Sequence, residues 1–547
     1  MIKNLSRREF LHAGGFAVLG AAAMGSEVFT GIAAGESSLE SWKQGDLVHL
    51  LPVVNYERIF LKASFRAPLG ETPRLRVGSS TTEGIKSDTL GRFWQFDAQG
   101  LEPGKEYELR LTGGGGGALC DPWPLKTFPA PHARPDRIRI LAYTCAGGNG
   151  DMPPLAGKTA FLPLAVRQRL LDRALSFSPD VVIANGDHVY WDQRTWLEHR
   201  NRGIRESTKK AYDQFGYLDR QFPVLGTKNE PVFTRIIDAQ VASLYGVRLR
   251  STPSYFIQDD HDYFENDEAD ERWITFPPGP FMLRLGRTTQ HLYYPEFPLD
   301  SNQPSGLPGA SAEDRRPGLS ESYGVLRYGR LIEVLMYDIR RYLTLKGPLA
   351  VFVDPDAEKW LTARTAAEGD TDHLIHVPSH PFGWAAGKWC EWYPDILEKD
   401  GTLGTSAPKY YWQPGWWAQH QRLLKAIGGQ KQRIPLIVSG DLHALAAGKI
   451  IKSGDLDFSD NPVNTVLSGP LGTGDLGFPS AFRDTPPKVP SQLSVEEMLK
   501  PLEKNAFTIL DVSPESIRFR LFAWRPPQPV EEIDRLEPIL AFELKKR

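Results

Sequence analysis

The chain has 547 residues, of which 41% are hydrophobic, and a formal net charge of -3 at pH 7. This length exceeds what a single hydrophobic core organises, so the composition predicts a globular protein with at least two domains. The lack of a strong basic cluster argues against a nucleic-acid-binding protein, and three cysteines are too few for a disulfide framework.

The N-terminus has the pattern of an export signal. Arg7 and Arg8 precede an apolar stretch rich in small residues, at 13–24. The pattern predicts a twin-arginine signal peptide over residues 1–35, recognised by the twin-arginine export machinery, and hence a periplasmic or secreted protein. The alternative is a chance arginine pair at an irregular N-terminus. The stretch is short for a membrane span, although its retention as an uncleaved anchor stays open, and no other segment is long and apolar enough to cross a bilayer.

Residues 45–130 are predicted to form a separate β domain. The segments 58–65 and 74–77 are short and strand-like, and 101–111 has the pattern of a turn followed by an alternating strand. The form Leu-x-Pro-Gly-x-x-Tyr in this last segment is similar to a turn of fibronectin-type sandwiches, so a fibronectin-like β-sandwich is expected. Three prolines within 129–135 predict a stiff linker to the next domain.

Residues 136–547 alternate between strand and helix patterns, which predicts an α/β layered domain. A strand at 137–143, a helix at 164–177 and a strand at 180–184 form a βαβ unit and imply a parallel pair of strands. The segment 507–524 is expected to add edge strands. Also expected are strands at 334–337, 373–377 and 434–439, helices at 358–367 and 416–427, and long loops at 265–320 and 384–415 that shape the active site.

Three apolar segments end in acidic and imidazole side chains. Asp187 follows the first, Asp-Asp-His-Asp at 259–262 follows the second, and Asp441 and His443 follow the third. Such a concentration of negative charge is costly unless a cation lies among it. The pattern therefore predicts metal ions at the carboxyl edge of one sheet.

These side chains suit a particular chemistry. Carboxylate oxygens bind hard ions, and imidazole adds affinity for transition metals. Two metal ions roughly 3.5–4 Å apart can hold a phosphate for in-line attack and activate a water molecule as the nucleophile. No serine or cysteine nucleophile is then needed.

The order of the motifs resembles the calcineurin-like metallophosphoesterase superfamily and, within it, the PhoD-like alkaline phosphatases. The opening strand ends in Cys145, where most of the superfamily has Asp-x-His; 186–190 matches a Gly-Asp-x-x-Tyr motif; and 259–262 is similar to Asp-Asp-His-Glu. The segments 337–340 and 358–361 are similar to an Asp-x-Arg strand and a Gln-x-x-Trp-Leu helix of these enzymes.

The resemblance covers roughly residues 50–525 and implies a role for each motif residue. Ferric iron would be held by Cys145, Asp187, Tyr190 and His443, and Ca²⁺ or another divalent ion by Asp187, Asp260 and Asp441. A dinuclear site with Mn²⁺, Zn²⁺ or Mg²⁺ is the alternative. His261 would stabilise the transition state or protonate the leaving oxygen. Arg340 would hold a carboxylate or contact phosphate.

Several residues depart from the family pattern. His188 is not the usual residue after Gly-Asp, and Asp262 is shorter than the usual Glu. His376 and His380 fall where the wider superfamily often has a metal-binding histidine, which PhoD-like members commonly lack. Each of these three histidines is equally well a ligand, a support for a ligand or a purely structural residue.

The motifs together predict an exported metal-dependent phosphoesterase that hydrolyses small phosphate mono- or diesters with a metal-activated hydroxide. The alternative of the same class is a dedicated phosphodiesterase or a phospholipase-type enzyme. A non-catalytic binding protein on the same fold is less well supported, because Asp187 and His261 are both present.

Overall fold

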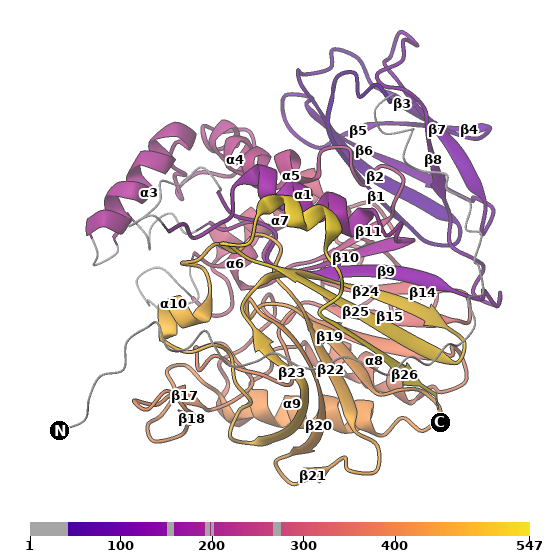
Figure 1. The fold of residues 1–547 in the computed structure, drawn as a ribbon. Coiled ribbons are helices and arrows are strands. Elements are labelled where there is room, and N and C mark those ends of the chain that lie inside the picture. Colours follow the sequence, from indigo (N-terminus) through magenta and orange to yellow (C-terminus); the bar gives the residue numbers. More distant parts are fainter. Residues whose placement is uncertain (1–41, 150–157, 192–196, 199–201, 266–274, 547) are drawn as a thin grey trace, which may run out of the picture. The chain divides into compact units, whose positions relative to one another are not determined.

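The computed structural model describes residues 42–149, 158–191, 197–198, 202–265 and 275–546 (Figure 1). Residues Gln44–Arg547 form one compact unit. The predicted signal segment, 1–35, lies outside the described residues, and the division into domains at 45–130 and 136–547 stays a prediction. Within the described ranges, no helix combines the length and the apolar composition needed to cross a membrane.

The first strands form two antiparallel sheets of four strands each, with the orders β1-β2-β6-β5 and β4-β3-β7-β8. In β7, buried and exposed residues alternate, as expected for a strand with one face in a core. The strands are β1 (Leu47–Val54), β2 (Arg58–Phe65), β3 (Arg74–Val77), β4 (Ser80–Glu83), β5 (Ile85–Lys86), β6 (Phe93–Gln99), β7 (Glu106–Thr112) and β8 (Trp123–Lys126).

Two large mixed sheets follow, here called sheet I and sheet II. Sheet I has the order β11-β10-β9-β24-β25-β26, and sheet II the order β14-β15-β16-β19-β22-β20-β21, with β23 also paired to β20. Sheet I contains β9 (Ile138–Tyr143), β10 (Val181–Asn185), β11 (Ser254–Ile257), β24 (Asn505–Ser513), β25 (Ser516–Trp524) and β26 (Leu540–Lys545). Sheet II contains β14 (Tyr323–Tyr328), β15 (Ile332–Tyr337), β16 (His373–Pro378), β19 (Leu436–Ser439), β20 (Leu445–Ser453), β21 (Leu456–Asp457), β22 (Val463–Ser468) and β23 (Leu493–Leu502).

Helices and short elements connect these strands. The helices are α1 (Leu164–Leu175), α3 (Arg202–Phe215), α4 (Asn229–Ile237), α5 (Ser243–Tyr245), α6 (Asp260–Tyr263), α7 (Pro280–Tyr293), α8 (Pro355–Ala366), α9 (Pro414–Gly428) and α10 (Pro479–Arg483). Short helical turns are η1 (Asp238–Ala242), η2 (Gly347–Leu349) and η3 (Val530–Arg535), and two-stranded pairs are β12 (Phe297–Pro298) with β13 (Leu319–Ser320) and β17 (Ile396–Leu397) with β18 (Leu403–Gly404).

The predicted βαβ unit is confirmed, because β9 and β10 are parallel neighbours joined through α1. Strand β10 is also parallel to β11, with Asn185 opposite Ile257. In sheet II, β15, β16, β19 and β22 are parallel. The carboxyl ends of these parallel strands therefore lie at a common edge within each sheet.

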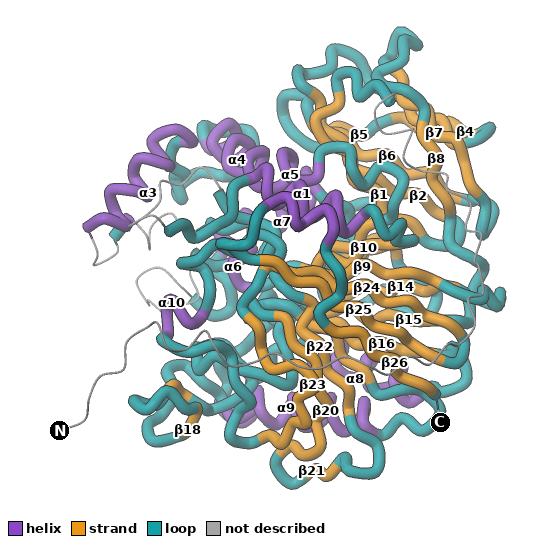
Figure 2. Tube along the Cα trace, in the orientation of Figure 1, coloured by secondary structure: helices purple, strands orange, loops and turns teal. Residues whose placement is uncertain are grey.

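The two sheets face each other through alternate side chains. Ile140 and Ile183 of sheet I line the same narrow space as Val334, Ile375 and Val438 of sheet II. Their neighbours along these strands, Leu141, Val182, Leu335 and Leu374, belong to two other buried clusters that include residues of the helices. Figure 2 shows α1 and α7 toward the top of the view and α8 and α9 toward the bottom, with the sheets between them. The central strands are therefore buried on both faces. This explains why the core strands have continuous apolar sequences where a half-exposed sheet would alternate.

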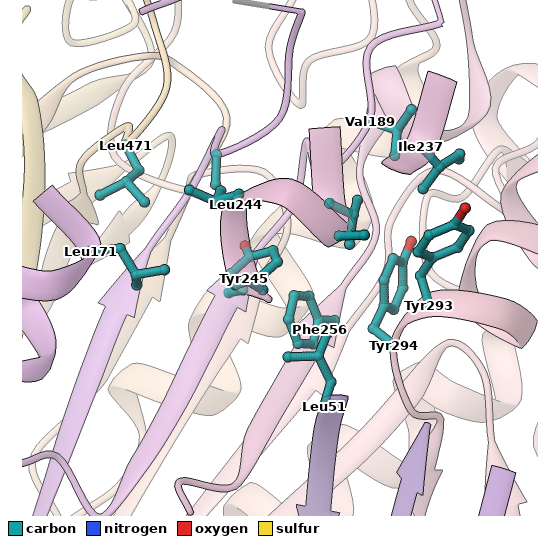
Figure 3. Close-up of a cluster of buried hydrophobic side chains, with 14 of the residues drawn as sticks. Leu51, Leu171, Val189, Ile237, Leu244, Tyr245, Phe256, Tyr293, Tyr294 and Leu471 are labelled. Atoms are coloured by element: carbon teal, nitrogen blue, oxygen red, sulfur yellow. The ribbon is translucent and has the colours of Figure 1, made fainter. Parts of the chain in front are cut away.

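On the helix side of sheet I, aromatic and aliphatic side chains fill the core. Leu171 of α1, Tyr245 of α5 and Phe256 of β11 are part of this cluster (Figure 3). The Phe256 ring lies 5.3 Å from the Tyr245 ring and 4.9 Å from the Tyr294 ring, between centroids. This packing fixes β11, and with it the loop that carries Asp260.

Two expectations about secondary structure were wrong. The segment 507–524 forms β24 and β25, which lie inside sheet I, because β24 pairs with β9 and β25 pairs with β26. The segment 265–320 is not only loop, since α7 spans Pro280–Tyr293. Gly279 precedes this helix and Pro280 occupies its first turn, so residues that suggested a loop in fact start a helix.

Candidate metal centre

The predicted ligands meet where the carboxyl edges of two sheets come together. Asp187 follows β10 and Asp260 follows β11, both in sheet I, whereas Asp441 follows β19 in sheet II. Carboxylate oxygens of these three residues lie within 4.8 Å of one another. The expectation of a single sheet edge was therefore wrong. The site needs both sheets, because the parallel strands that carry it belong to separate hydrogen-bonded sheets.

One group of donors surrounds Oδ2 of Asp187. Cys145 Sγ lies 3.2 Å from this oxygen, Tyr190 Oη lies 3.2 Å from it, and His443 Nε2 lies 3.7 Å from it. Tyr190 Oη is also 3.0 Å from His443 Nε2. The other ring nitrogen of His443 contacts the carbonyl of Gly477, which orients Nε2 toward the group. The structure thus brings together the four residues predicted to hold iron.

A second group consists of Asp187, Asp260 and Asp441, all buried. Asp187 belongs to both groups, as a bridging ligand would. Here the structure adds a residue that the sequence did not indicate. Nζ of Lys388 lies 2.7 Å from Asp441 Oδ1 and 3.3 Å from Asp260 Oδ2.

The backbone of the site is strained. Cys145, Asp187, Asp441 and His443 have φ angles of 49°, 57°, 69° and 48°, in the left-handed region that non-glycine residues seldom adopt. Each such residue costs on the order of 1–3 kcal/mol and persists only where its surroundings hold it. Four strained residues among the predicted ligands indicate a site whose geometry is imposed by the fold.

Asp262 holds the loop that carries Asp187. Its carboxylate accepts hydrogen bonds from the backbone N–H groups of Asp187 at 3.0 Å, His188 at 3.1 Å and Val189 at 3.1 Å. Gly186 allows the close approach, since a Cβ there would lie 2.6 Å from Cβ of Asp259. Asp262, which stands where the resembled motif has Glu, thus holds the backbone next to a predicted ligand.

Arg340 lies beneath the carboxylates and is fully buried. Its Nε donates to Asp259 Oδ1 at 2.6 Å, and its Nη2 donates to Asp441 Oδ2 at 3.0 Å. Of the two roles expected for Arg340, these contacts correspond to holding a carboxylate. We therefore treat Arg340 as a positioning residue. Its assignment as a catalytic residue, in contact with phosphate, stays a prediction.

The surroundings of Cys145 and Asp441 shift the pKa of each side chain. Burial raises the pKa of the Cys145 thiol well above its usual range, and the negative charge of Asp187 raises it further. Burial also opposes the charge of Asp441, yet Lys388, His380 and Arg340 hold its pKa well below the usual range. A cation beside Cys145 would reverse the first shift and stabilise the thiolate. The first group of donors therefore fits a metal ion, and its thiol, phenol, imidazole and carboxylate side chains suit a transition metal better than Mg²⁺.

His261 lies at the edge of both groups. Its backbone N–H lies 3.4 Å from Asp187 Oδ1, and its ring centroid is 4.3 Å from that of Tyr190. Its ring is not part of either group of ligand atoms within the described residues. This position agrees with a role toward a substrate and leaves the ligand set to the other residues.

The three histidines that departed from the family pattern have different surroundings. Nε2 of His188 is 2.8 Å from the carbonyl of Ile257, and burial lowers the pKa of His188 to about 4. The ring nitrogens of His376 lie 3.3 Å from Tyr337 Oη and 3.0 Å from Thr365 Oγ1. Nδ1 of His380 contacts Oδ2 of Asp441 directly. His188 and His376 are thus engaged elsewhere, whereas His380 supports a predicted ligand.

Comparison with known proteins gives likeness in structure but not in sequence. No family model and no curated protein matches the chain. The solved structure of PhoD has a TM-score of 0.57 and 13% identity, covering 91% of this chain and 90% of that chain. The purple acid phosphatase PPD1 from yellow lupin (Lupinus luteus) seeds has a TM-score of 0.51 and 12% identity, covering 92% of this chain and 74% of that chain. The predicted α/β layered metallophosphoesterase fold is confirmed.

Proposed function

We propose that this protein is an exported, metal-dependent phosphoesterase that hydrolyses phosphate mono- or diesters. The observation that carries the proposal is the meeting of Cys145, Asp187, Tyr190 and His443 around one point at the edge of sheets I and II. Two proteins that share the fold, PhoD and the lupin purple acid phosphatase, support the same class of chemistry.

We assign a separate role to each group of residues in the site. Cys145, Asp187, Tyr190 and His443 would hold ferric iron. The resemblance to PhoD-like enzymes assigns Ca²⁺, or alternatively Mn²⁺, Zn²⁺ or Mg²⁺, to Asp187, Asp260 and Asp441. When bound, metal ions supply positive charge beside the phosphate and lower the pKa of water. His261 delivers a proton to the leaving oxygen. Arg340 and Asp262 keep Asp441 and Asp187 in place.

The substrate class is tested with the purified, metal-loaded protein. Hydrolysis of nitrophenyl phosphate and of bis-nitrophenyl phosphate should be measured side by side, before and after metal removal by a chelator. We expect turnover of at least one ester and its loss on chelation. Metal-loaded protein that hydrolyses neither would favour the non-catalytic binding protein, and hydrolysis of the diester alone would identify a dedicated phosphodiesterase.

Tyr190→Phe tests the identity of the first metal. A phenolate bound to ferric iron absorbs visible light by charge transfer, so the concentrated wild-type protein should be coloured. The variant should lose this absorption and keep its fold, because Phe fills the same space beside Phe161, whose ring centroid lies 4.8 Å away. Absorption spectra and iron analysis measure both properties. Colourless, active wild-type protein that contains only zinc or manganese would contradict the iron assignment.

Export is inferred from the Arg7–Arg8 segment, which lies outside the described residues. The twin-arginine route carries folded proteins, so an iron ion acquired in the cytoplasm would be retained after export. Cell fractionation of the protein produced with its own N-terminus tests the periplasmic or secreted location. Retention in the cytoplasm of cells with an active twin-arginine pathway would contradict it.

A further inference from the structure

We propose that the ammonium group of Lys388 takes the place of the second metal ion, so that the site works with one bound ion and one built-in cation. From the proposed function, this proposal takes only the assignment of the first metal ion to Cys145, Asp187, Tyr190 and His443. Lys388 lies in the loop between β16 and β17, and 5% of its surface is exposed. Its Nζ contacts Asp260 and Asp441, two of the three carboxylates to which the resemblance assigns the second ion.

Most carboxylate oxygens of the second group already have polar partners. Oδ2 of Asp441 contacts Arg340 and His380, and its Oδ1 contacts Lys388. Oδ2 of Asp260 also contacts Lys388. Asp260 Oδ1 has an ion pair with Arg340 at 3.9 Å and no hydrogen-bond donor among the described residues. Oδ2 of Asp187 contacts Cys145 and Tyr190, and its Oδ1 lies 3.4 Å from the backbone nitrogen of His261.

This donor set is poor for a divalent ion. Ca²⁺ takes about six to eight oxygen ligands at roughly 2.3–2.6 Å, and Mg²⁺ requires a near-octahedral shell. A divalent ion placed between Asp260 and Asp441 would compete with the ammonium for the same oxygens and would be repelled by its charge. Lys388 and Arg340 already place two positive charges beside Asp259, Asp260 and Asp441.

Lys388 is held in this position by the packing of its neighbours. The Trp389 ring centroid lies 4.5 Å from that of Phe276 and 5.9 Å from that of Phe264. The carbonyl of Cys390 accepts a hydrogen bond from Arg340 Nη1 at 2.5 Å. The backbone on the C-terminal side of Lys388 is thus tied to the same arginine that binds Asp441. The ammonium group of Lys388 is thus held inside the site, whereas the ammonium group of an exposed lysine lies in solvent.

The charge of Lys388 acts on both carboxylates. Nζ of Lys388 lies 2.7 Å from Asp441 Oδ1 and 3.3 Å from Asp260 Oδ2, so its positive charge stabilises the negative charge of both carboxylates. An ammonium thus gives the site what a metal ion would give, namely two ionised carboxylates in a buried place. It does so with a single positive charge and without a dissociable ion.

Metal stoichiometry tests the proposal without relying on activity. Wild-type protein, Lys388→Met and Lys388→Arg should be saturated with iron and then with Ca²⁺ or Mn²⁺, freed of loose ions by gel filtration, and analysed by mass spectrometry of the metals. We expect about one ion per chain in the wild type and about two in Lys388→Met, because removal of the ammonium leaves carboxylates that a divalent ion can neutralise. Lys388→Arg keeps a positive charge at this position, so this variant should still bind about one ion per chain.

Lys409→Met is the matched control. Lys409 lies in the loop between β18 and α9 and is also buried, and its Nζ is 2.8 Å from Glu391 Oε2. Among the described residues, Glu391 is the one carboxylate with which it forms an ion pair. Lys409→Met should bind no additional ion, and circular dichroism should establish the fold of every variant. About two ions per wild-type chain, or no gain in folded Lys388→Met, would overturn the proposal. If Lys388→Met does not fold, the wild-type stoichiometry alone decides.

This outcome is separable from that of the proposed function. Wild-type protein with two ions and phosphoesterase activity would overturn the role of Lys388 and leave the function standing. One ion per chain with no hydrolysis of either nitrophenyl ester would support the role of Lys388 and contradict the function.

Discussion

His261→Ala is expected to lower the turnover rate by about two to four orders of magnitude, the usual range for a lost general acid or base, and to leave the metal content unchanged. The ring of His261 lies against Tyr190, with 4.3 Å between ring centroids, and takes no part in either group of ligand atoms within the described residues. Its proton is needed only as charge develops on the leaving oxygen, so the loss should appear in kcat and much less in KM.

The leaving group of the substrate gives this prediction its sharpest check. A nitrophenolate leaves without protonation, so the variant should lose least on nitrophenyl esters and most on alkyl phosphates. Metal analysis and kinetics on the same sample separate the two roles of the residue. Loss of metal from the variant would make His261 a ligand. Unchanged activity toward alkyl phosphates would transfer the role of acid to another group. Replacement of the exposed His132 by Ala is a suitable control.

Arg340→Met is expected to lower the free energy of unfolding by about 3–5 kcal/mol, the range for breaking a buried ion pair by removing one partner. The guanidinium contacts Asp259 and Asp441 at 2.6 and 3.0 Å, and its side chain has 0% exposure. Burial already raises the pKa of Asp259 well above its usual range, and Arg340 is the main group that opposes this shift. Without Arg340, Asp259 would lose its counter-charge, and Asp441 would lose one of its cationic partners.

Denaturant unfolding of the metal-free protein measures this effect. Adding Asp259→Asn to Arg340→Met should recover part of the lost stability, because the unpaired charge is then removed as well. Arg169→Met is the control, since Arg169 makes a similar two-point contact with Asp534, at 2.7 and 2.6 Å, but on the surface. It should have little effect. A stability of Arg340→Met equal to that of the control would show that the buried network does not hold the site together.

The sequence by itself determined the local parts of this protein. The βαβ pattern at 137–184 predicted parallel strands, and β9 and β10 have that arrangement, because alternating strand and helix periods leave few topologies. Asp187 and His443 could be selected as candidate ligands because they closely follow predicted strands, whereas Cys145 and Tyr190 joined them only through the resemblance to PhoD-like enzymes. Metal-ligating side chains that follow a predicted strand can be recognised from the sequence without knowledge of the tertiary structure.

Other features could be decided only by the tertiary structure. Lys388 does not belong to any recognisable motif. Its contact with Asp441 joins two segments that are 53 positions apart along the chain. The same is true of Arg340, whose partners Asp259 and Asp441 are separated from it by 81 and 101 positions. Sheets I and II meet through side chains that look like ordinary core residues in the sequence, so their common edge was mistaken for that of one sheet. Contacts of this kind leave no periodic pattern, because the free energy that fixes them comes from burial and charge pairing between distant segments and not from local propensity.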